Sequence, residues 1–175
     1  ILLVEKYGGA WIDITLLLTS PLSKEVFEYP FYSFNFKNTN YKPQGLGQSI
    51  SKCNWAGFML CSSSPKESLF TFVKDALIKY WSVFDTTIDY FLLNLIIRVV
   101  YLRDESIKKK IDNIPTNNSQ LYKLQPLLNS LYTKEVWNAI TIDTQFFKTT
   151  QKLSYRREIE GALTFYGYLC KTYNL

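Results

Sequence analysis

A glycine pair followed by an apolar segment with a single carboxylate constrains the fold of this chain more than any other feature. Gly8 and Gly9 precede residues 11–18, which are apolar apart from Asp13 and Thr15. Gly8 can take the left-handed backbone conformation that closes a helix, and Gly9 permits a sharp turn. The pattern therefore predicts the end of a helix, a glycine turn, and one strand over residues 11–18.

The carboxylate in this predicted strand needs a partner. An ionised Asp is costly to bury unless another group pairs with it, and a divalent cation is a suitable partner. Side chains two residues apart on a strand share a face, so we expect Asp13 and Thr15 to project together. Their oxygens would then meet one metal ion or one ribose–diphosphate group. The alternative is a half-buried Asp13 held by backbone amides at a strand end.

The composition indicates a folded protein of mildly basic character. A length of 175 residues fits one domain, and 47% hydrophobic residues exclude a disordered chain. The net charge of +5 suits a diphosphate donor, an acidic polysaccharide or an anionic membrane surface, and it selects none of them. The positive charges are mostly dispersed, so we do not expect a nucleic-acid partner.

The absence of histidine restricts the chemistry. It excludes Ser-His and Cys-His catalysis and HExxH zinc sites, which leaves carboxylates, hydroxyls, amides or a metal. Cys53, Cys61 and Cys170 lack metal-ligand spacing and fit a reducing compartment. The longest apolar run, residues 90–102, is too short and too polar to cross a bilayer. Because Ile1 falls within the predicted helix, we expect a fragment whose N-terminal part is absent.

Periodicity and turn residues predict the remaining elements. Ser64, Pro65 and Glu67 form the pattern of a capping box and predict a helix over 65–81. A second helix, apolar on nearly every face and therefore buried, is expected from Thr86 to Leu102. Other ranges are predicted as strands or loops: strands over 31–36, 54–61 and 145–155, and a long loop over 37–52.

Two further groups of residues have the chemistry of a binding site. Asp89 stands three residues after Thr86, where it can cap the helix or, facing a cleft, orient or deprotonate an acceptor hydroxyl. Asn54 and Trp55 can grip a sugar through amide hydrogen bonds and ring stacking. The plain alternative for this second pair is a turn Asn followed by a core Trp.

These pieces together resemble a known family. Tyr-Gly-Gly-x-Trp-x-Asp-x-Thr, from Tyr7 to Thr15, resembles the sugar-nucleotide motif of capsular polysaccharide synthesis proteins. That family is similar to glycosyltransferases with an Asp-x-Asp sugar-binding motif. Asn-Trp, Tyr-Trp, Ile-Asp-Tyr-Phe and Lys-Leu-x-Tyr then follow in the order that the resemblance predicts. The resemblance implies an α/β domain of the GT-A type over residues 1–175, lacking its N-terminal nucleotide-binding strands.

The resemblance also implies a function. The expected enzyme moves a sugar from a nucleotide-sugar donor to a growing capsular or cell-surface polysaccharide, assisted by Mn²⁺ or Mg²⁺. Asp13 and Thr15 would hold the metal and diphosphate, and Asp89 would be the catalytic residue. The implied substrate-binding residues are Gly8, Gly9, Trp11, Asp13, Asn54, Trp55, Tyr90 and Lys152. The expected location is the cytoplasm, with peripheral association at the inner face of the membrane as a further option.

The cation of Lys152 or of Arg156 would neutralise a leaving diphosphate, and the alternative is an exposed basic strand end. Two departures from the family pattern bear on the metal. Thr15 stands where many relatives have Asp, and the chain has no late histidine to complete a metal site. The rival function is a non-catalytic carbohydrate-binding or scaffold protein of the same fold, which predicts sugar binding that is indifferent to metal. A second rival, a basic adaptor for anionic polymers, predicts steep salt dependence without donor specificity.

Overall fold

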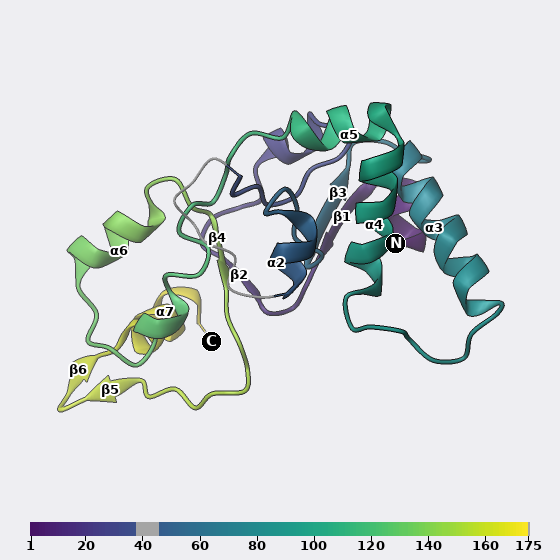
Figure 1. The fold of residues 1–175 in the computed structure, drawn as a ribbon. Coiled ribbons are helices and arrows are strands. Elements are labelled where there is room, and N and C mark those ends of the chain that lie inside the picture. The colour runs from purple at the N-terminus through teal and green to yellow at the C-terminus, as the bar shows by residue number, and fades with distance from the viewer. Residues whose placement is uncertain (38–45, 175) are drawn as a thin grey trace. The chain divides into compact units, whose positions relative to one another are not determined.

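The computed structural model describes residues 1–37 and 46–174, which form helices and small antiparallel sheets (Figure 1). The expected mixed α/β class is confirmed. The chain divides into two compact units. Unit 1 consists of Ile1–Asp13 and Ser23–Asn117, and unit 2 of Ile14–Leu22 and Asn118–Leu175. The expectation of one domain over the whole chain stays a prediction.

Unit 1 is built from five α-helices, a 3-10 helix and one pair of strands among the described residues. Its elements in chain order are α1 (Leu2–Tyr7), β1 (Gly9–Ile12), a 3-10 helix (Lys24–Phe27), α2 (Leu46–Ser51), β3 (Met59–Ser62), α3 (Ser68–Trp81), α4 (Leu92–Arg103) and α5 (Glu105–Asp112). β1 and β3 pair antiparallel from Gly9↔Ser62 to Ile12↔Met59. The helices α3 and α4 pack against each other beside this pair (Figure 1).

The glycine turn between α1 and β1 forms as predicted, with one difference in backbone conformation. The Gly8 N–H donates to the Val4 carbonyl at 2.8 Å and closes α1. Gly8 has φ 72° and ψ −158°, so it lies outside the left-handed helical region that the sequence suggested. The backbone conformation that Gly8 adopts is essentially restricted to glycine. Gly9 also has a positive φ of 90°. The turn therefore needs glycine at both positions.

The expectation of one strand over residues 11–18 is wrong. β1 ends at Ile12, and a separate strand β2 (Leu16–Leu18) belongs to unit 2, where it pairs with β4 (Phe146–Lys148). The physical reason is that the two halves find different partners. The Asp13 N–H donates to the Phe58 carbonyl at 2.9 Å, whereas the Thr15 carbonyl accepts from the Thr149 N–H at 2.8 Å.

The start of α3 also differs from its prediction. The helix begins at Ser68 rather than Pro65, and the Glu67 carboxylate, not Ser64, caps it by accepting from the Leu69 N–H at 2.8 Å. The preceding residue, Lys66, has a positive φ of 57°, and its N–H donates to the Glu5 carbonyl at 2.7 Å. A tertiary hydrogen bond therefore replaces the first predicted helical turn.

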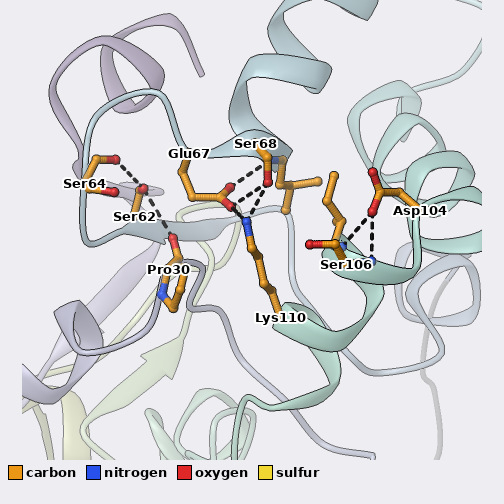
Figure 2. Close-up of polar contacts among 10 residues, drawn as sticks. Pro30, Ser62, Ser64, Glu67, Ser68, Asp104, Ser106 and Lys110 are labelled. Carbon is orange, nitrogen blue, oxygen red and sulfur yellow. Dashed lines mark hydrogen bonds and ion pairs between the residues drawn. The ribbon is translucent and has the colours of Figure 1, made fainter.

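The capping carboxylate also ties α3 to α5. The Lys110 ammonium lies 2.7 Å from Glu67 Oε1 and 2.7 Å from the Ser68 hydroxyl, which itself donates to Glu67 at 3.0 Å (Figure 2). The Glu67 side chain is only 3% exposed, and that of Lys110 is 29% exposed. Because the carboxylate is buried with several donors, it is compensated for the loss of water.

Three other expectations for unit 1 need correction. Residues 31–36 are all buried and form only an isolated bridge, Tyr32↔Cys61, instead of a strand. The predicted loop over 37–52 contains α2 at its end, and its residues 38–45 lie outside the described residues. The helix α4 begins at Leu92 rather than Thr86, and its Val99 and Leu102 side chains are exposed, so this helix is not buried on every face.

Unit 2 encloses its own apolar cluster. Its elements are β2, a 3-10 helix (Gln125–Leu127), α6 (Lys134–Thr141), β4, β5 (Glu158–Ile159), β6 (Ala162–Leu163) and α7 (Phe165–Tyr173). The cluster consists of buried residues in these elements or directly flanking them: Leu124, Leu128, Ile140, Phe147, Phe165 and Leu169. The strand expected over 145–155 is reduced to the three residues of β4.

The three cysteines, Cys53, Cys61 and Cys170, are free and buried. Burial raises the pKa of the Cys61 thiol to about 12 and also raises the pKa of Cys53. Within the described residues, no helix has the length and apolar character needed to cross a membrane.

The ion pair between the buried Glu67 carboxylate and the partly exposed Lys110 predicts a stability effect. Glu67→Ala removes the α3 cap and leaves Lys110 without its carboxylate, so the free energy of unfolding should fall by about 2–4 kcal/mol. Glu105→Ala is the matched control, because it removes an exposed carboxylate that lies 3.4 Å from Lys108, and it should cost less than about 1 kcal/mol. Urea unfolding measures both. Equal losses in the two variants would contradict the role given to this ion pair.

Candidate functional site

The candidate site lies at the end of β1, in unit 1. Asp13 directly follows β1 and is half-buried. Its backbone bond to Phe58 extends the β1–β3 ladder by one residue. Phe58 belongs to a tight turn in which Ala56 and Met59 form a bridge, with the Met59 N–H donating to the Ala56 carbonyl at 3.1 Å. The pairing of β1 with β3 therefore fixes Asp13 beside the turn of residues 56–59, which we call the β3 turn.

The amide of Asn94, from the first turn of α4, packs against the same β3 turn. A Cβ atom on Gly57 would lie 3.0 Å from Asn94 Oδ1 and 3.1 Å from Asn94 Nδ2, so only glycine leaves full room for this amide. The Trp55 indole N–H donates to Asn94 Oδ1 at 3.1 Å. Sequence reasoning did not select Asn94. The available signal was a lone amide among the apolar residues of α4.

Asn54 and Trp55 precede the β3 turn in the sequence and are buried. Each is 2% exposed. The Trp55 ring packs 5.8 Å from the ring of Tyr101, and Asn54 Nδ2 donates to the Tyr101 hydroxyl at 3.4 Å. Within the described residues, Asn54 Oδ1 is buried without a hydrogen-bond partner. In this conformation Asn54 and Trp55 support the site from the protein interior. The Trp55 ring has no exposed face on which a sugar can stack.

A series of polar contacts, which we call the polar chain, continues from Tyr101 into α5. The Tyr101 hydroxyl donates to Asp112 Oδ1 at 2.9 Å, and the Lys37 ammonium lies 3.2 Å from the same oxygen. Burial, and then the hydrogen bond to Asp112, raise the pKa of Tyr101 above its usual value. The Arg98 guanidinium lies over the Tyr101 ring at 5.2 Å. These contacts connect Asn54 and Trp55, the residues that support the site, to the end of α5.

Asp89 precedes α4, and its side chain caps the turn that leads into this helix. Its Oδ1 accepts from the Phe91 N–H at 2.6 Å, and the Thr87 hydroxyl donates to its carbonyl at 2.7 Å. The predicted capping box with Thr86 does not form, because the helix starts only at Leu92. Within the described chain, Asp89 Oδ2 makes no hydrogen bond. The capping and catalytic roles proposed for Asp89 are therefore compatible.

Other predicted substrate-binding residues of unit 1 are either exposed or shape the backbone. Trp11 on β1 is 47% exposed, and Tyr90, beside Asp89, is 90% exposed, so both present aromatic rings to solvent. Gly8 and Gly9 shape the turn that leads into β1. A Cβ on Gly8 would meet the Ser64 backbone at 3.2 Å, whereas one on Gly9 would meet nothing within 4 Å.

Thr15 and Lys152 belong to unit 2. The Lys148 ammonium donates to the Thr15 hydroxyl, which makes this oxygen unfavourable for a second cation. Lys152 is exposed, and its backbone N–H donates to the Thr150 hydroxyl at 3.2 Å. Because Asp13 lies in unit 1, the expected shared strand face of Asp13 and Thr15 does not exist. Their individual roles stay predictions.

The residues present fit a metal only as a site shared with substrate. Over residues 1–37 and 46–174, no group of three or more His, Cys, Asp or Glu side chains is placed to hold an ion. Mg²⁺ commonly binds one or two carboxylates together with substrate phosphates and water. Asp13 can supply such a carboxylate, while the Lys148 contact argues against Thr15 as a second ligand.

The fold and this cluster define a mixed α/β protein with a carboxylate and an amide beside one tight turn. The model of the capsular polysaccharide synthesis protein family matches residues 1–169. The chain therefore belongs to this family, as the resemblance predicted, and membership indicates a role in capsule biosynthesis. Neither a curated protein nor a solved structure gives a significant match. The relationship to Asp-x-Asp glycosyltransferases stays a prediction.

The polar chain through Tyr101 predicts a stability and pH effect. Tyr101→Phe leaves Asn54 and Asp112 without this partner and should lower the free energy of unfolding by about 1–2 kcal/mol at pH 7. Because the folded pKa is raised, the contribution of the tyrosine is complete below about pH 10 and is lost as pH rises through the folded pKa. Chemical unfolding from pH 7 to 11 should therefore show a shallower alkaline loss in the variant.

The matched control is Tyr90→Phe, which removes a hydroxyl from a residue that is 90% exposed. It should keep the wild-type stability at pH 7. An alkaline loss as steep in Tyr101→Phe as in the wild type would contradict the role given to the Tyr101 hydroxyl.

Proposed function

We propose that this chain is a glycosyltransferase that moves a sugar from a nucleotide-sugar donor to a growing capsular or cell-surface polysaccharide. The main observation that supports this proposal is the position of Asp13 beside the β3 turn, against which Asn94 of α4 also packs. Membership of the capsular polysaccharide synthesis family supports this assignment. We further propose that the chain forms part of a GT-A-type domain and works in the cytoplasm at the inner face of the membrane.

The donor is proposed to bind at Asp13. The carboxylate would hold Mn²⁺ or Mg²⁺ together with the donor diphosphate. When bound, the metal would neutralise the negative charge that develops on the leaving diphosphate. The Gly8–Gly9 turn fixes the path of the chain into β1, and Trp11 presents a partly exposed ring near Asp13 in the sequence. Lys152 belongs to unit 2, and its proposed role as a cation for phosphate is separate from the site at Asp13.

The acceptor is proposed to meet Asp89. In the transfer, the acceptor hydroxyl oxygen forms a bond to the anomeric carbon of the sugar. The bond from that carbon to the diphosphate oxygen breaks, and the diphosphate leaves with the electron pair. The hydroxyl proton passes to a carboxylate, for which Asp89 Oδ2 is proposed because Oδ1 is occupied by the Phe91 N–H. Tyr90 presents an exposed ring on which a sugar can stack.

The second candidate function is a non-catalytic carbohydrate-binding or scaffold protein of the same fold. The observation that favours it is the Thr15 hydroxyl, which accepts from Lys148 where a transferase with a two-ligand motif would place a metal. Such a protein would bind glycans equally well with metal and with chelator.

The test is a calorimetric titration of the full chain with uridine, guanosine and thymidine diphosphate hexoses, in Mn²⁺ and in chelator. The proposed transferase binds at least one donor only with metal, and Asp13→Asn weakens that binding at least about tenfold, since a metal–carboxylate contact is lost. Asp75→Asn is the matched control, because it neutralises a carboxylate on α3 that is 66% exposed, and it should leave the affinity unchanged.

Metal-independent binding of glycans, unaffected by Asp13→Asn, would instead support the scaffold. Absence of donor binding by the folded wild-type chain would overturn the transferase.

A further inference from the structure

We propose that Asn94 is a further substrate-binding residue, whose amide N–H groups donate to a hydroxyl of the donor sugar beside Asp13. This inference rests on the proposed function and identifies which part of the donor the site reads. Trp55 is the positioning residue, since it acts through Asn94.

The indole of Trp55 determines which way the Asn94 amide faces. An indole N–H can only donate, so the atom 3.1 Å away must be the amide oxygen, Oδ1. Trp55 is 2% exposed and packed against Tyr101, so this donor is held in place. The amide nitrogen of Asn94 must therefore face away from Trp55.

The amide nitrogen has no partner in the described part of the chain. Asn94 is 8% exposed, and its one hydrogen bond there is the one it accepts from Trp55. Among the described residues, Asn54 Oδ1 is the buried side-chain atom without a partner, so Asn94 Nδ2 keeps some contact with solvent. A ligand that reaches this atom can therefore accept from it.

Gly57 brings this amide to the turn that also holds Asp13. The missing Cβ allows Asn94 to lie against Gly57, and the next residue, Phe58, accepts the Asp13 N–H at 2.9 Å. The Asn94 amide and the backbone of Asp13 therefore contact the same turn of four residues.

The two groups together favour a hydroxyl over a phosphate oxygen. A hydroxyl both accepts and donates, so it can accept from Asn94 and donate to Asp13. A phosphate oxygen only accepts and is repelled by a carboxylate. Sugar hydroxyls are thus the chemistry that this pair recognises.

The test compares a nucleoside diphosphate hexose with the same nucleoside diphosphate lacking the sugar. Asn94→Leu keeps about the size of the side chain and removes the N–H donors without adding a charge. In Mn²⁺, affinity for the sugar nucleotide should fall at least about tenfold, and affinity for the free diphosphate should change less than about twofold. Asn113→Leu, which makes the same replacement at the exposed C-cap of α5, should alter neither.

A second variant keeps the test open if Asn94→Leu fails to fold. Trp55→Phe preserves an aromatic ring but removes the indole donor, so the Asn94 amide loses its fixed orientation. It should show the same selective loss for the sugar nucleotide. Thermal unfolding checks that each variant is folded.

Equal loss for both ligands, or no loss for either, in a folded variant would overturn this inference while leaving the transferase intact. Failure of the wild-type chain to bind any sugar nucleotide would overturn the proposed function itself, and the inference with it.

Discussion

The antiparallel pairing of β1 with β3 is the constraint on which the candidate site depends. It carries Asp13 to the β3 turn, and it holds the Gly8–Gly9 corner against the backbone at Ser64. Since β1 ends at Ile12, Asp13 lies where the chain leaves the sheet, so its carboxylate is only half-buried. A carboxylate in this position can meet a ligand while its backbone remains fixed.

Support and contact are divided between different residues in unit 1. Trp55 and Asn54 are almost fully buried and bond to Asn94 and Tyr101, and the polar chain then reaches Asp112. Residues nearer the surface, such as the half-buried Asp13, are the ones proposed to contact substrate. Buried and hydrogen-bonded neighbours fix the rotamers of the groups that they support, which is a requirement for a precise site. Under the proposed function, this division would let Asn54 and Trp55 support sugar binding without touching the sugar.

Much of the local structure followed from sequence, but the long-range partners did not. The glycine turn after α1 and the helix containing Val73 were predictable, because glycine conformation and apolar periodicity are local properties. The division between Asp13 and Thr15 was not, since it depends on β2 pairing with a strand more than a hundred residues away. Asn94 was missed for the same reason: the groups that orient it, Trp55 and Gly57, come from a distant turn.

The most direct test of the central claim is to locate the bound donor by NMR. Paramagnetic Mn²⁺, added with a nucleoside diphosphate hexose to the ¹⁵N-labelled full chain, broadens the signals of nearby groups. The account predicts metal- and donor-dependent broadening of the Asp13 and Phe58 backbone amides and of the Asn94 side-chain amide, while the exposed Asn113 side chain stays sharp. Broadening centred elsewhere, or the same broadening with Mn²⁺ and no donor, would contradict a donor site at the end of β1.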